Sequence, residues 1–334
     1  MRPRNINSGI LVDALNSQVE QIVEAHLTGV YPRSEKLVTA TRATVRGELS
    51  QTEVDRTLED DTKSLTLLEE HASLDYIVDG QLNWQDLFRP FSEIFSGIQA
   101  TTLTRWFDNN TFYRKPMITE KVQFRGKAIQ QYFRSDLLPK ERRKKAILPG
   151  PLTFALLSEN KAYASLADLV EDVAKALKAT VKMLQNSGYD QFQFNDPCLT
   201  ALDRKSSELQ TAKKAYETCA NGKGLLHTYF GDASPVIDAL LDLPVEAIGI
   251  DFYSTPLQKL RGHDFTKRLG CGCIDGRNSL LEATDQLKAI ILDTRDQLEP
   301  RDMYVTPNCD LDFLPSAVAE KKIQILSETK RMLV

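Results

Sequence analysis

The stretch Gly224-Leu225-Leu226-His227-Thr228-Tyr229-Phe230-Gly231-Asp232 decides how the rest of the chain is interpreted. It starts with an apolar run that favours β-structure and ends with a histidine, a tyrosine and a Gly-Asp turn. This pattern is typical of a buried strand that carries polar groups to the edge of a sheet. Similar short runs recur along the chain and end in Gly, Asp, Asn or Cys. We therefore expect a functional site where the ends of these strands meet.

The overall composition is that of an ordinary globular protein. The chain has 334 residues, of which 42% are hydrophobic and 26% are charged, and its formal net charge is -4. This charge argues against nucleic-acid binding by bulk electrostatics. The basic run over 140–145 is interpreted as the solvated face of a helix, with an anion-binding patch as the alternative.

The sequence also predicts the compartment of the protein. No apolar run approaches the roughly 20 residues that a membrane span requires, and residues 1–5 lack the apolar core of a signal peptide. The five cysteines are an odd number without the spacing of a disulfide framework, which favours a reducing environment. We therefore expect a cytoplasmic protein without a membrane partner.

Eight short β-favouring runs alternate with helical patterns. The runs lie at 27–33, 74–81, 145–151, 191–197, 224–232, 247–251, 268–275 and 303–309. The helical patterns lie at 10–27, 50–72, 83–95, 165–187, 204–220, 233–242, 278–297 and 315–332. Strands that alternate with helices form parallel sheets, and eight repeats favour a closed (β/α)8 TIM barrel over an open doubly wound sheet. No Gly-x-Gly-x-x-Gly fingerprint follows the first strand, which also disfavours the open sheet.

The chain is therefore predicted to be one barrel domain over 1–334, with an N-terminal helical extension over 1–26. An aromatic insertion over 102–126 follows the second strand unit. It contains Trp106, Phe107, Phe112, Tyr113 and Phe124, together with Pro116. Such an insertion either covers the site or packs on the flank of the barrel, and the sequence favours neither interpretation.

Polar and reactive side chains collect at the predicted carboxyl ends of the strands, where such barrels carry out their chemistry. They are Arg33, Asp79, Gln81, Asn195, Asp196, His227, Tyr229, Asp251, Asp275, Arg277, Asn308 and Cys309. Nitrogen, carboxylate and thiolate donors from His227, Asp251 and Cys309 suit zinc, and three ligands leave a position open for a substrate thiol. Their spacing matches no compact zinc motif. On spacing alone, the favoured interpretation is that His227 and Asp251 make hydrogen bonds and that Cys309 is a small buried residue.

Two further groups have alternative interpretations. Tyr229 either stacks on a ligand ring or fills the rim of the barrel. Asp275 and Arg277 either pair with each other or bind the carboxylate group of a ligand.

The chain resembles the cobalamin-independent methionine synthases from about residue 27 to residue 332, and four motifs carry this resemblance. The run over 106–113 resembles the family's Trp-Phe-Asp-Thr-Asn-Tyr-His-Tyr, and the run over 148–153 resembles its Gly-Pro-(Leu/Val)-Thr strand end. The run over 193–197 resembles Gln-(Ile/Val)-Asp-Glu-Pro, and the run over 272–278 resembles Gly-Val-Ile-(Asp/Asn)-Gly-Arg-Asn. This resemblance implies one zinc-type (β/α)8 barrel.

The two-barrel members of that family combine a catalytic C-terminal barrel with a related N-terminal barrel that lacks metal. The runs over 228–230 and 275–278 and the segment with Arg33 and Lys36 resemble the N-terminal barrel. The catalytic barrel has His-x-Cys at 227–229 and Glu at 251, and its fourth ligand is matched by Cys309. The resemblance thus implies zinc held by His227, Asp251 and Cys309, with one family ligand replaced by Tyr229.

The resemblance also implies a set of functional side chains. Those with catalytic roles are Asp196, Tyr229 and Asp275, and those that contact substrate are Arg33, Lys36, Gln81, Asn195 and Arg277. The family's glutamate and aspartate that hold the ammonium group of homocysteine are replaced here by Gln81 and Asn195. Because each charge-assisted contact contributes about 1.5–3 kcal/mol, we expect this contact to be weakened.

Three functions follow as hypotheses. The first is methyl transfer to a thiol such as homocysteine, with a zinc-activated thiolate and with folate or a methyl-corrinoid protein as methyl donor. The second is a metal-free companion barrel that binds the methyl donor or docks a separate catalytic barrel as its partner subunit. A third is a barrel that acts on an unrelated substrate.

Overall fold

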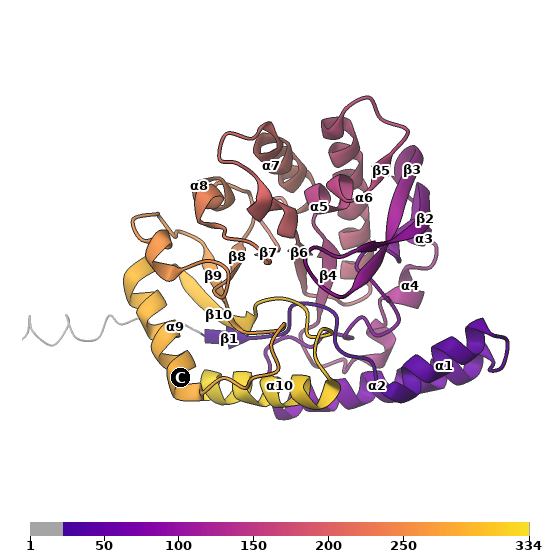
Figure 1. Ribbon diagram of the computed structural model, residues 1–334, viewed down its shortest axis with the longest axis horizontal. Coiled ribbons are helices and arrows are strands. Elements are labelled where there is room, and N and C mark those ends of the chain that lie inside the picture. Colours follow the sequence, from indigo (N-terminus) through magenta and orange to yellow (C-terminus); the bar gives the residue numbers. More distant parts are fainter. Residues whose placement is uncertain (1–22, 334) are drawn as a thin grey trace, which may run out of the picture.

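The computed structural model describes residues 23–333, and its first element differs from the sequence prediction (Figure 1). Most of the helix predicted over 10–27, and of the helical extension predicted over 1–26, lies outside the described residues. Where they overlap, the prediction is wrong, because Val23–Ala25 form strand β1 and the chain then runs as a loop through 27–33. Val23 and Ala25 are buried in the sheet, and this tertiary packing outweighs the helical spacing of the apolar residues.

Seven parallel strands form one curled sheet (Figure 1). In spatial order they are β1, β10 (Asp302–Pro307), β9 (Arg268–Ile274), β8 (Ala247–Asp251), β7 (Leu225–Thr228), β6 (Gln191–Asn195) and β4 (Lys145–Pro149). From β4 onward the strands therefore coincide with the predicted runs. The register pairs Asn195 with His227 and His227 with Gly249, which brings the carboxyl ends of β6, β7 and β8 to one level.

The second predicted strand, over 74–81, is reduced to a single bridge. Ile77 pairs with Lys144 beside β4, and its amide donates to the carbonyl of Arg143 at 2.9 Å. On its other side, the amide of Asp75 donates to the carbonyl of Ala25 in β1 at 2.9 Å. The α/β fold with a curled parallel sheet is thus confirmed, whereas a complete eight-stranded barrel is not.

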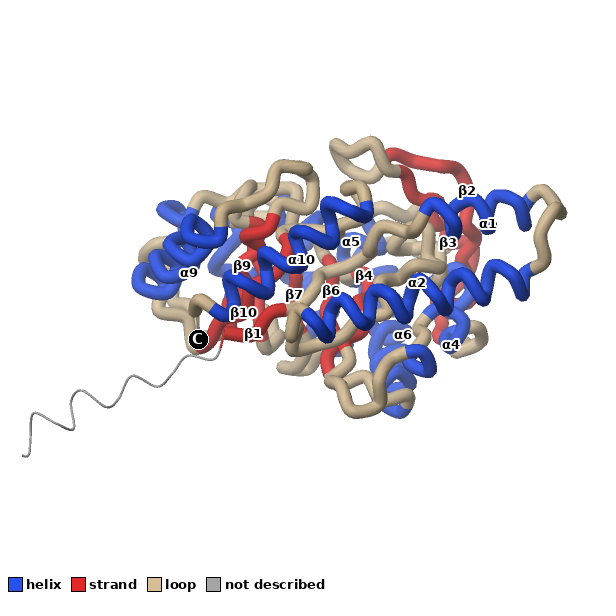
Figure 2. The backbone as a smooth tube through the Cα atoms, turned by 90° about the horizontal axis from the view of Figure 1, so that it is seen from below, coloured by secondary structure: helices blue, strands red, loops and turns tan. Residues whose placement is uncertain are grey.

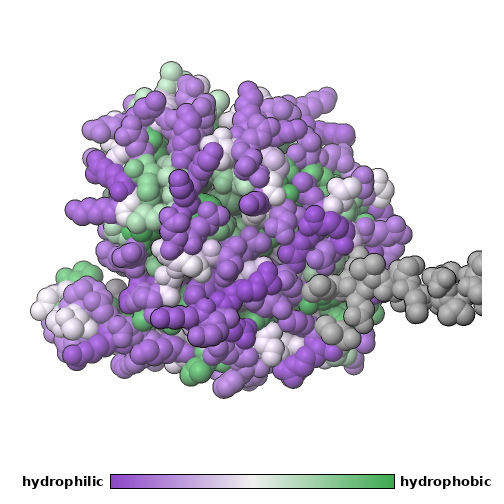
Figure 3. Space-filling view, turned by 180° about the vertical axis from the view of Figure 1, so that it is seen from behind, coloured by the Kyte–Doolittle hydropathy of each residue, from purple (hydrophilic) through white to green (hydrophobic). Residues whose placement is uncertain are grey.

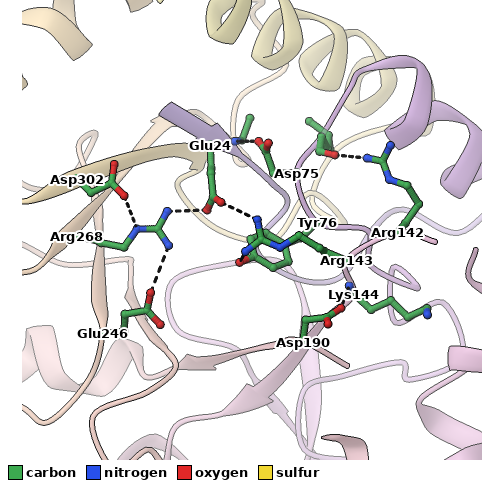
Figure 4. A network of polar contacts seen from close by, with 12 residues as sticks. Glu24, Asp75, Tyr76, Arg142, Arg143, Lys144, Asp190, Glu246, Arg268 and Asp302 are labelled. Atoms are coloured by element: carbon green, nitrogen blue, oxygen red, sulfur yellow. Dashed lines mark hydrogen bonds and ion pairs between the residues drawn. The ribbon is translucent and has the colours of Figure 1, made fainter. Parts of the chain in front are cut away.

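A network of charged side chains lies at the amino ends of the strands, next to the segment over 74–81, and connects β1 with β9 and with the residues before β4 (Figure 4). Glu24 of β1 bonds Arg268 of β9 at 2.6 Å and Arg143, just before β4, at 2.8 Å. Arg143 also lies over the ring of Tyr76, at 4.0 Å from its centroid. Arg268 has Asp302 as a further partner at 3.2 Å. Side-chain contacts therefore hold the segment around Tyr76 where backbone pairing is sparse.

Helices cover the outside of the sheet, and Figure 2 shows α2 and α10 running across the face that is seen from below. The longer helices are α1 (Glu35–Val45), α2 (Gln51–His71), α6 (Leu166–Asn186), α7 (Ser207–Cys219), α9 (Thr284–Leu298) and α10 (Ser316–Arg331). The shorter ones are α3 (Phe91–Ile94), α4 (Ile129–Tyr132), α5 (Pro151–Leu156) and α8 (Ile237–Leu241). Ser50 and Glu53 form a capping box at the start of α2, where the sequence predicts the helix over 50–72 to begin.

The helix predicted over 83–95 is wrong, because most of this segment forms turns and only α3 is helical. Its aromatic side chains pack into the hydrophobic core instead. The Trp84 indole is buried and donates to the carbonyl of Tyr132 at 2.9 Å, and its ring packs against Phe133. These tertiary contacts outweigh the weak local helix preference.

The aromatic insertion predicted over 102–126 is part of a β-hairpin that begins before residue 102. Strand β2 (Phe95–Arg105) pairs antiparallel with β3 (Phe112–Phe124), and β5 (Glu159–Asn160) adds a short third strand. Trp106 and Tyr113 pack edge-on against Phe88. The hairpin is therefore anchored in the main core.

Hydrophilic side chains cover most of the face seen in Figure 3, with hydrophobic ones in scattered patches. Among residues 23–333, no helix combines the length and the apolar character that a membrane crossing requires.

The Glu24 network generates a stability prediction. Burial raises the pKa of Glu24, but its bonds to Arg268 and Arg143 outweigh burial and lower the pKa from the ordinary 4.5. The stabilisation is therefore present at neutral pH and is lost as the pH falls below about 4.5. Glu24→Gln should cost about 3 kcal/mol of unfolding free energy at pH 7 in urea titrations, because it leaves a buried guanidinium short of a partner.

The matched control is Glu48→Gln, which removes an exposed carboxylate paired only with Arg46. It should change stability little. If Glu24→Gln costs no more than this control at pH 7, the network does not hold the sheet together.

Candidate functional site

The two polar residues at the end of β6 are tied into the scaffold in different ways. Asn195 accepts a hydrogen bond from Gln193 Nε2 at 2.7 Å and donates to the carbonyl of Thr28 at 3.2 Å. Asp196 accepts from the Thr153 amide at 2.7 Å and from the Tyr216 hydroxyl at 2.9 Å. Asp196 therefore caps the amino end of α5. Burial raises the pKa of Asp196 to about 6.

His227 of β7 is buried and faces the interior of the sheet. Its Nε2 lies 2.8 Å from the carbonyl oxygen of Asn308, so Nε2 carries the proton and Nδ1 is the free acceptor. No hydrogen-bond partner reaches Nδ1, which points at Gly249, where an added Cβ would lie only 2.1 Å away. Burial lowers the pKa of His227 to about 4, so the ring is neutral near pH 7.

Tyr229 follows His227 at the end of β7 and is also fully buried. Its ring packs against His227, with the ring centroids 5.7 Å apart. Its hydroxyl has no hydrogen-bond partner among the described residues. Burial, with the charges of Asp310 and Cys309, raises the pKa of Tyr229 far above its ordinary value. The phenol is therefore neutral and lies close to the strand ends, where the Asn195 side chain interacts with its hydroxyl and opposes the rise in its pKa.

Asp251 organises the turn after β8. Its carboxylate accepts hydrogen bonds from the amide of Tyr253 at 2.9 Å, the hydroxyl of Ser254 at 2.8 Å and the side-chain amide of Asn308 at 3.1 Å. An amide N–H of Phe230 adds a longer contact at 3.3 Å. Both carboxylate oxygens thus serve the fold of this end of the sheet.

Cys309 lies directly after β10 and is fully buried. Its Sγ lies 3.5 Å from the carbonyl oxygen of Asp310. Burial, reinforced by the charge of Asp310, raises the pKa of the Cys309 thiol well above its ordinary value. The thiol form is therefore favoured over the thiolate that binds metals.

These donors do not fit a zinc ion. Within the described part of the chain, no group of three or more His, Cys, Asp and Glu side chains has a geometry that could hold a metal. His227 Nε2 is bonded to a carbonyl oxygen, and Asp251 is fully used by its turn. Although the sequence brings His227, Asp251 and Cys309 to one end of the sheet, the structure does not assemble them as a ligand set.

The residues at the end of β9 reach the aromatic hairpin. Asp275 accepts a hydrogen bond from the amide of Arg277 at 2.9 Å, and no ion pair joins their side chains in the described structure. The Arg277 guanidinium donates to the carbonyl of Asp108 at 3.3 Å and lies 5.2 Å from the ring centroid of Phe230. Arg277 thus links the hairpin tip to the loop after β7. This contact favours the interpretation that the insertion covers the site.

The predicted substrate-binding residues of the first half lie apart. Lys36 is exposed on α1 and pairs with Asp60 at 3.5 Å. Arg33 is half-buried at a cavity of about 640 Å³, where Gln81 also contributes to the wall. Gln81 Nε2 donates to the carbonyl of Ile147 at 3.4 Å, and Gln81 Oε1 has no partner.

Sequence reasoning missed two carboxylates, Asp310 and Asp312, which immediately follow Cys309. Asp310 is buried and accepts from the amide of Val30 at 3.0 Å. Asp312 lines the cavity that Arg33 and Gln81 also line, and its Oδ1 is buried without a partner. Their position after a strand that ends in Asn-Cys was the signal that could have revealed them.

The close approach of Asp310 depends on Gly29. A Cβ at Gly29 would lie 1.5 Å from the Asp310 carboxylate, a separation that no side chain tolerates. The glycine in the loop after β1 therefore makes room for the carboxylate from the loop after β10.

A family comparison can now be set beside this geometry. The model described as "Cobalamin-independent synthase, N-terminal domain" matches residues 91–298, more than half of the chain. The chain belongs to the cobalamin-independent methionine synthase family.

Similar proteins span the same length. The methionine synthase of Saccharolobus solfataricus is 25% identical over 312 residues, which cover 91% of this chain and 93% of the relative. That of Sulfurisphaera tokodaii is 25% identical over 311 residues and 90% of each chain. These relatives agree with the family resemblance of the sequence motifs.

Solved structures of this family share the fold. A vitamin-B12-independent methionine synthase from a Shewanella species, in complex with selenomethionine, has a TM-score of 0.75 at 18% identity and covers 93% of this chain and 97% of its own. A putative vitamin-B12-independent methionine synthase from Listeria monocytogenes has a TM-score of 0.77 at 15% identity, covering 94% and 99%.

The tight contact between Gly29 and Asp310 generates a second prediction. Gly29→Ala should destabilise the protein by about 1–3 kcal/mol, because the new methyl group displaces the Asp310 carboxylate. Adding Asp310→Ala should restore part of this loss by removing the clashing group. Urea unfolding of both single variants and the double variant measures the coupling. Strictly additive effects would contradict the contact.

Proposed function

We propose that this chain is a methyltransferase that transfers a methyl group to a thiol such as homocysteine. The observation that carries the proposal is the cavity of about 640 Å³ at the carboxyl end of β1, which Arg33, Gln81 and Asp312 line, in a chain of this family. This is the end of the sheet where such folds bind small molecules. The Shewanella neighbour, described in complex with selenomethionine, adds support for a ligand of the methionine type.

Tyr229 has a free polar atom near the strand ends. We assign to its hydroxyl the role of donating a hydrogen bond to the substrate sulfur, which stabilises the thiolate left when the thiol releases its proton to solvent before the methyl group is transferred. Asp196 and Asp275 act as positioning residues in this proposal, since Asp196 caps α5 and Asp275 shapes the turn that carries Arg277.

The proposal contains no zinc-dependent step. The resemblance implies a zinc-activated thiolate, but His227, Asp251 and Cys309 do not form a ligand set within the described residues. The step assigned to Tyr229 accordingly uses protein groups alone.

The methyl donor is proposed to be a folate or a methyl-corrinoid protein. Arg277 is exposed beside the hairpin tip. Lys36 lies on α1, and Arg33 lies just before this helix. These cations suit a donor with an acidic tail. We propose a cytoplasmic location, because all five cysteines are free thiols. No nucleic-acid or membrane partner belongs to the proposal.

A second candidate is a companion barrel that binds the methyl donor or docks a separate catalytic barrel. Two observations favour it. The matching family model describes the N-terminal domain, and the donor set of the metal-binding barrel is not assembled here.

One assay separates the two candidates. The purified chain is incubated with homocysteine and either methyl-labelled methyltetrahydrofolate or a methyl-corrinoid protein, and labelled methionine is measured by mass spectrometry. The methyltransferase proposal predicts methionine formation by the chain alone, resistant to dialysis against a zinc chelator. Formation only after a catalytic barrel is added supports the companion barrel, and no formation in either case contradicts both.

Tyr229→Phe tests the assigned hydroxyl. It should lower kcat about 10- to 100-fold near pH 7 with partial recovery at higher pH, because loss of the hydrogen bond raises the pKa of the bound thiol and lowers the thiolate fraction. The buried ring is retained, so the melting temperature should stay close to that of the native chain. An unchanged kcat would remove Tyr229 from the mechanism.

A further inference from the structure

The tip of the aromatic hairpin is a short loop, residues 107–112, between two anchored side chains. Trp106 and Tyr113 are buried and belong to the hydrophobic core, so both ends of the loop are fixed. The Trp106 amide donates to the carbonyl of Thr111 at 2.9 Å, and Asn109 Nδ2 donates to the carbonyl of Trp106 at 3.1 Å. The loop is therefore closed by its own hydrogen bonds.

We call Phe107, Phe230 and Arg277 the latch, because their contacts connect this loop to the ends of the strands. The ring centroids of Phe107 and Phe230 lie 5.4 Å apart. The Arg277 guanidinium lies 5.2 Å from the ring centroid of Phe230 and donates to the carbonyl of Asp108 at 3.3 Å. This hydrogen bond is long, and Arg277 is exposed. Contacts of these kinds are individually weak, so a small free energy holds the loop in place.

Both phenylalanines of the latch have a strained backbone. The angle φ is 48° at Phe107 and 67° at Phe230, in the left-handed region that bulky side chains rarely adopt. At Phe230 the turn is supported by Asp251, whose carboxylate accepts from the Phe230 amide at 3.3 Å. Such strain persists only where surrounding contacts impose it. Release of the loop therefore relieves strain at Phe107, which favours opening.

A small cavity of about 30 Å³ lies beneath the loop. Thr111 and Phe112 of the loop form part of its wall, and Asp310, Asp312 and Phe313 of the segment after β10 form another part. Thr111 Oγ1 and Asp312 Oδ1 are buried without hydrogen-bond partners in the described part of the chain. The volume suffices for about two waters, whereas ligand pockets typically measure about 300–1,000 Å³. With the loop in this position, a ligand cannot reach these two atoms from below the loop.

We propose that residues 107–112 form a gate over the carboxyl ends of the strands, and that the latch holds this gate closed. The small cavity adjoins the cavity of about 640 Å³, since Val30, Gln85 and Asp312 line both. Opening of the gate joins the two cavities and makes Thr111 Oγ1 and Asp312 Oδ1 available to a ligand. The inference goes beyond the proposed function, because it concerns access to the site and holds for any ligand that binds there.

The reactivity of a thiol placed beneath the gate tests this inference. Thr111→Cys introduces a thiol where the native hydroxyl oxygen is buried, and the five native cysteines are buried as well. The full-length variant is treated with iodoacetamide under native conditions, and modification of each cysteine is followed by peptide mass spectrometry. We expect slow modification of the introduced thiol, because it reacts only while the gate is open.

Weakening the latch should accelerate this reaction. Arg277→Gln and Phe107→Leu, each combined with Thr111→Cys, should raise the modification rate about 3- to 10-fold, because each removes one weak contact from the closed state. The matched control is Arg105→Gln, since Arg105 is an exposed arginine on β2 of the same hairpin and lies outside the latch. It should change the rate by less than about twofold.

The buried thiol of Cys271 in β9 reports unfolding of the whole domain in the same samples. Its modification should stay equally slow in every variant. The inference is overturned if the introduced thiol reacts as fast as free cysteine, or if it does not react in any variant. It is also overturned if the latch variants leave the rate unchanged or accelerate Cys271 to the same extent. None of these measurements requires methyl transfer, so failure of the methionine assay and failure of the gate are distinguishable.

Discussion

The pairing of Glu24 with Arg268 and Arg143 is the contact on which the curled sheet depends. It joins β1 to β9 and to the residues before β4, across the place where the segment over 74–81 makes only one bridge. Backbone pairing normally closes such a ring, since it satisfies every strand edge. Here buried charge pairs and the contact between Arg143 and Tyr76 supply much of that connection (Figure 4).

The amino and carboxyl ends of the strands therefore carry different kinds of polar side chain. The amino ends carry paired charges whose partners are all protein groups. The carboxyl ends carry Tyr229, Gln81 and Asp312, each with a buried polar atom that has no partner among the described residues. Paired charges add stability, whereas unsatisfied polar atoms lower it and are retained where a ligand can complete them. Unsatisfied atoms are not confined to the carboxyl ends, however, because Arg268 Nε and the Tyr304 hydroxyl also lack a hydrogen-bond partner within residues 23–333.

Much of the fold could be predicted from the sequence because the relevant signals are local. The strands from β4 onward and helices α2, α6, α7, α9 and α10 follow apolar runs and periodic patterns, whereas α1 was not predicted. The errors lie where distant contacts decide, as in β1 and in the turns around Trp84. The site was predicted only in part. Asp310 and Asp312 were missed, since no local pattern shows that a carboxylate after β10 meets Gly29 and the cavity beside Arg33.

The sequence by itself determined the family and brought His227, Asp251 and Cys309 to the carboxyl ends of three strands, because strand position and motif are properties of short segments. Only the tertiary structure decided what these residues do. His227 Nε2 bonds the carbonyl of Asn308 and Asp251 holds the turn after β8, while the free His227 Nδ1 points at Gly249. The physical reason is that a ligand set requires free atoms within bonding distance. Which atoms remain free depends on contacts between residues far apart in the chain.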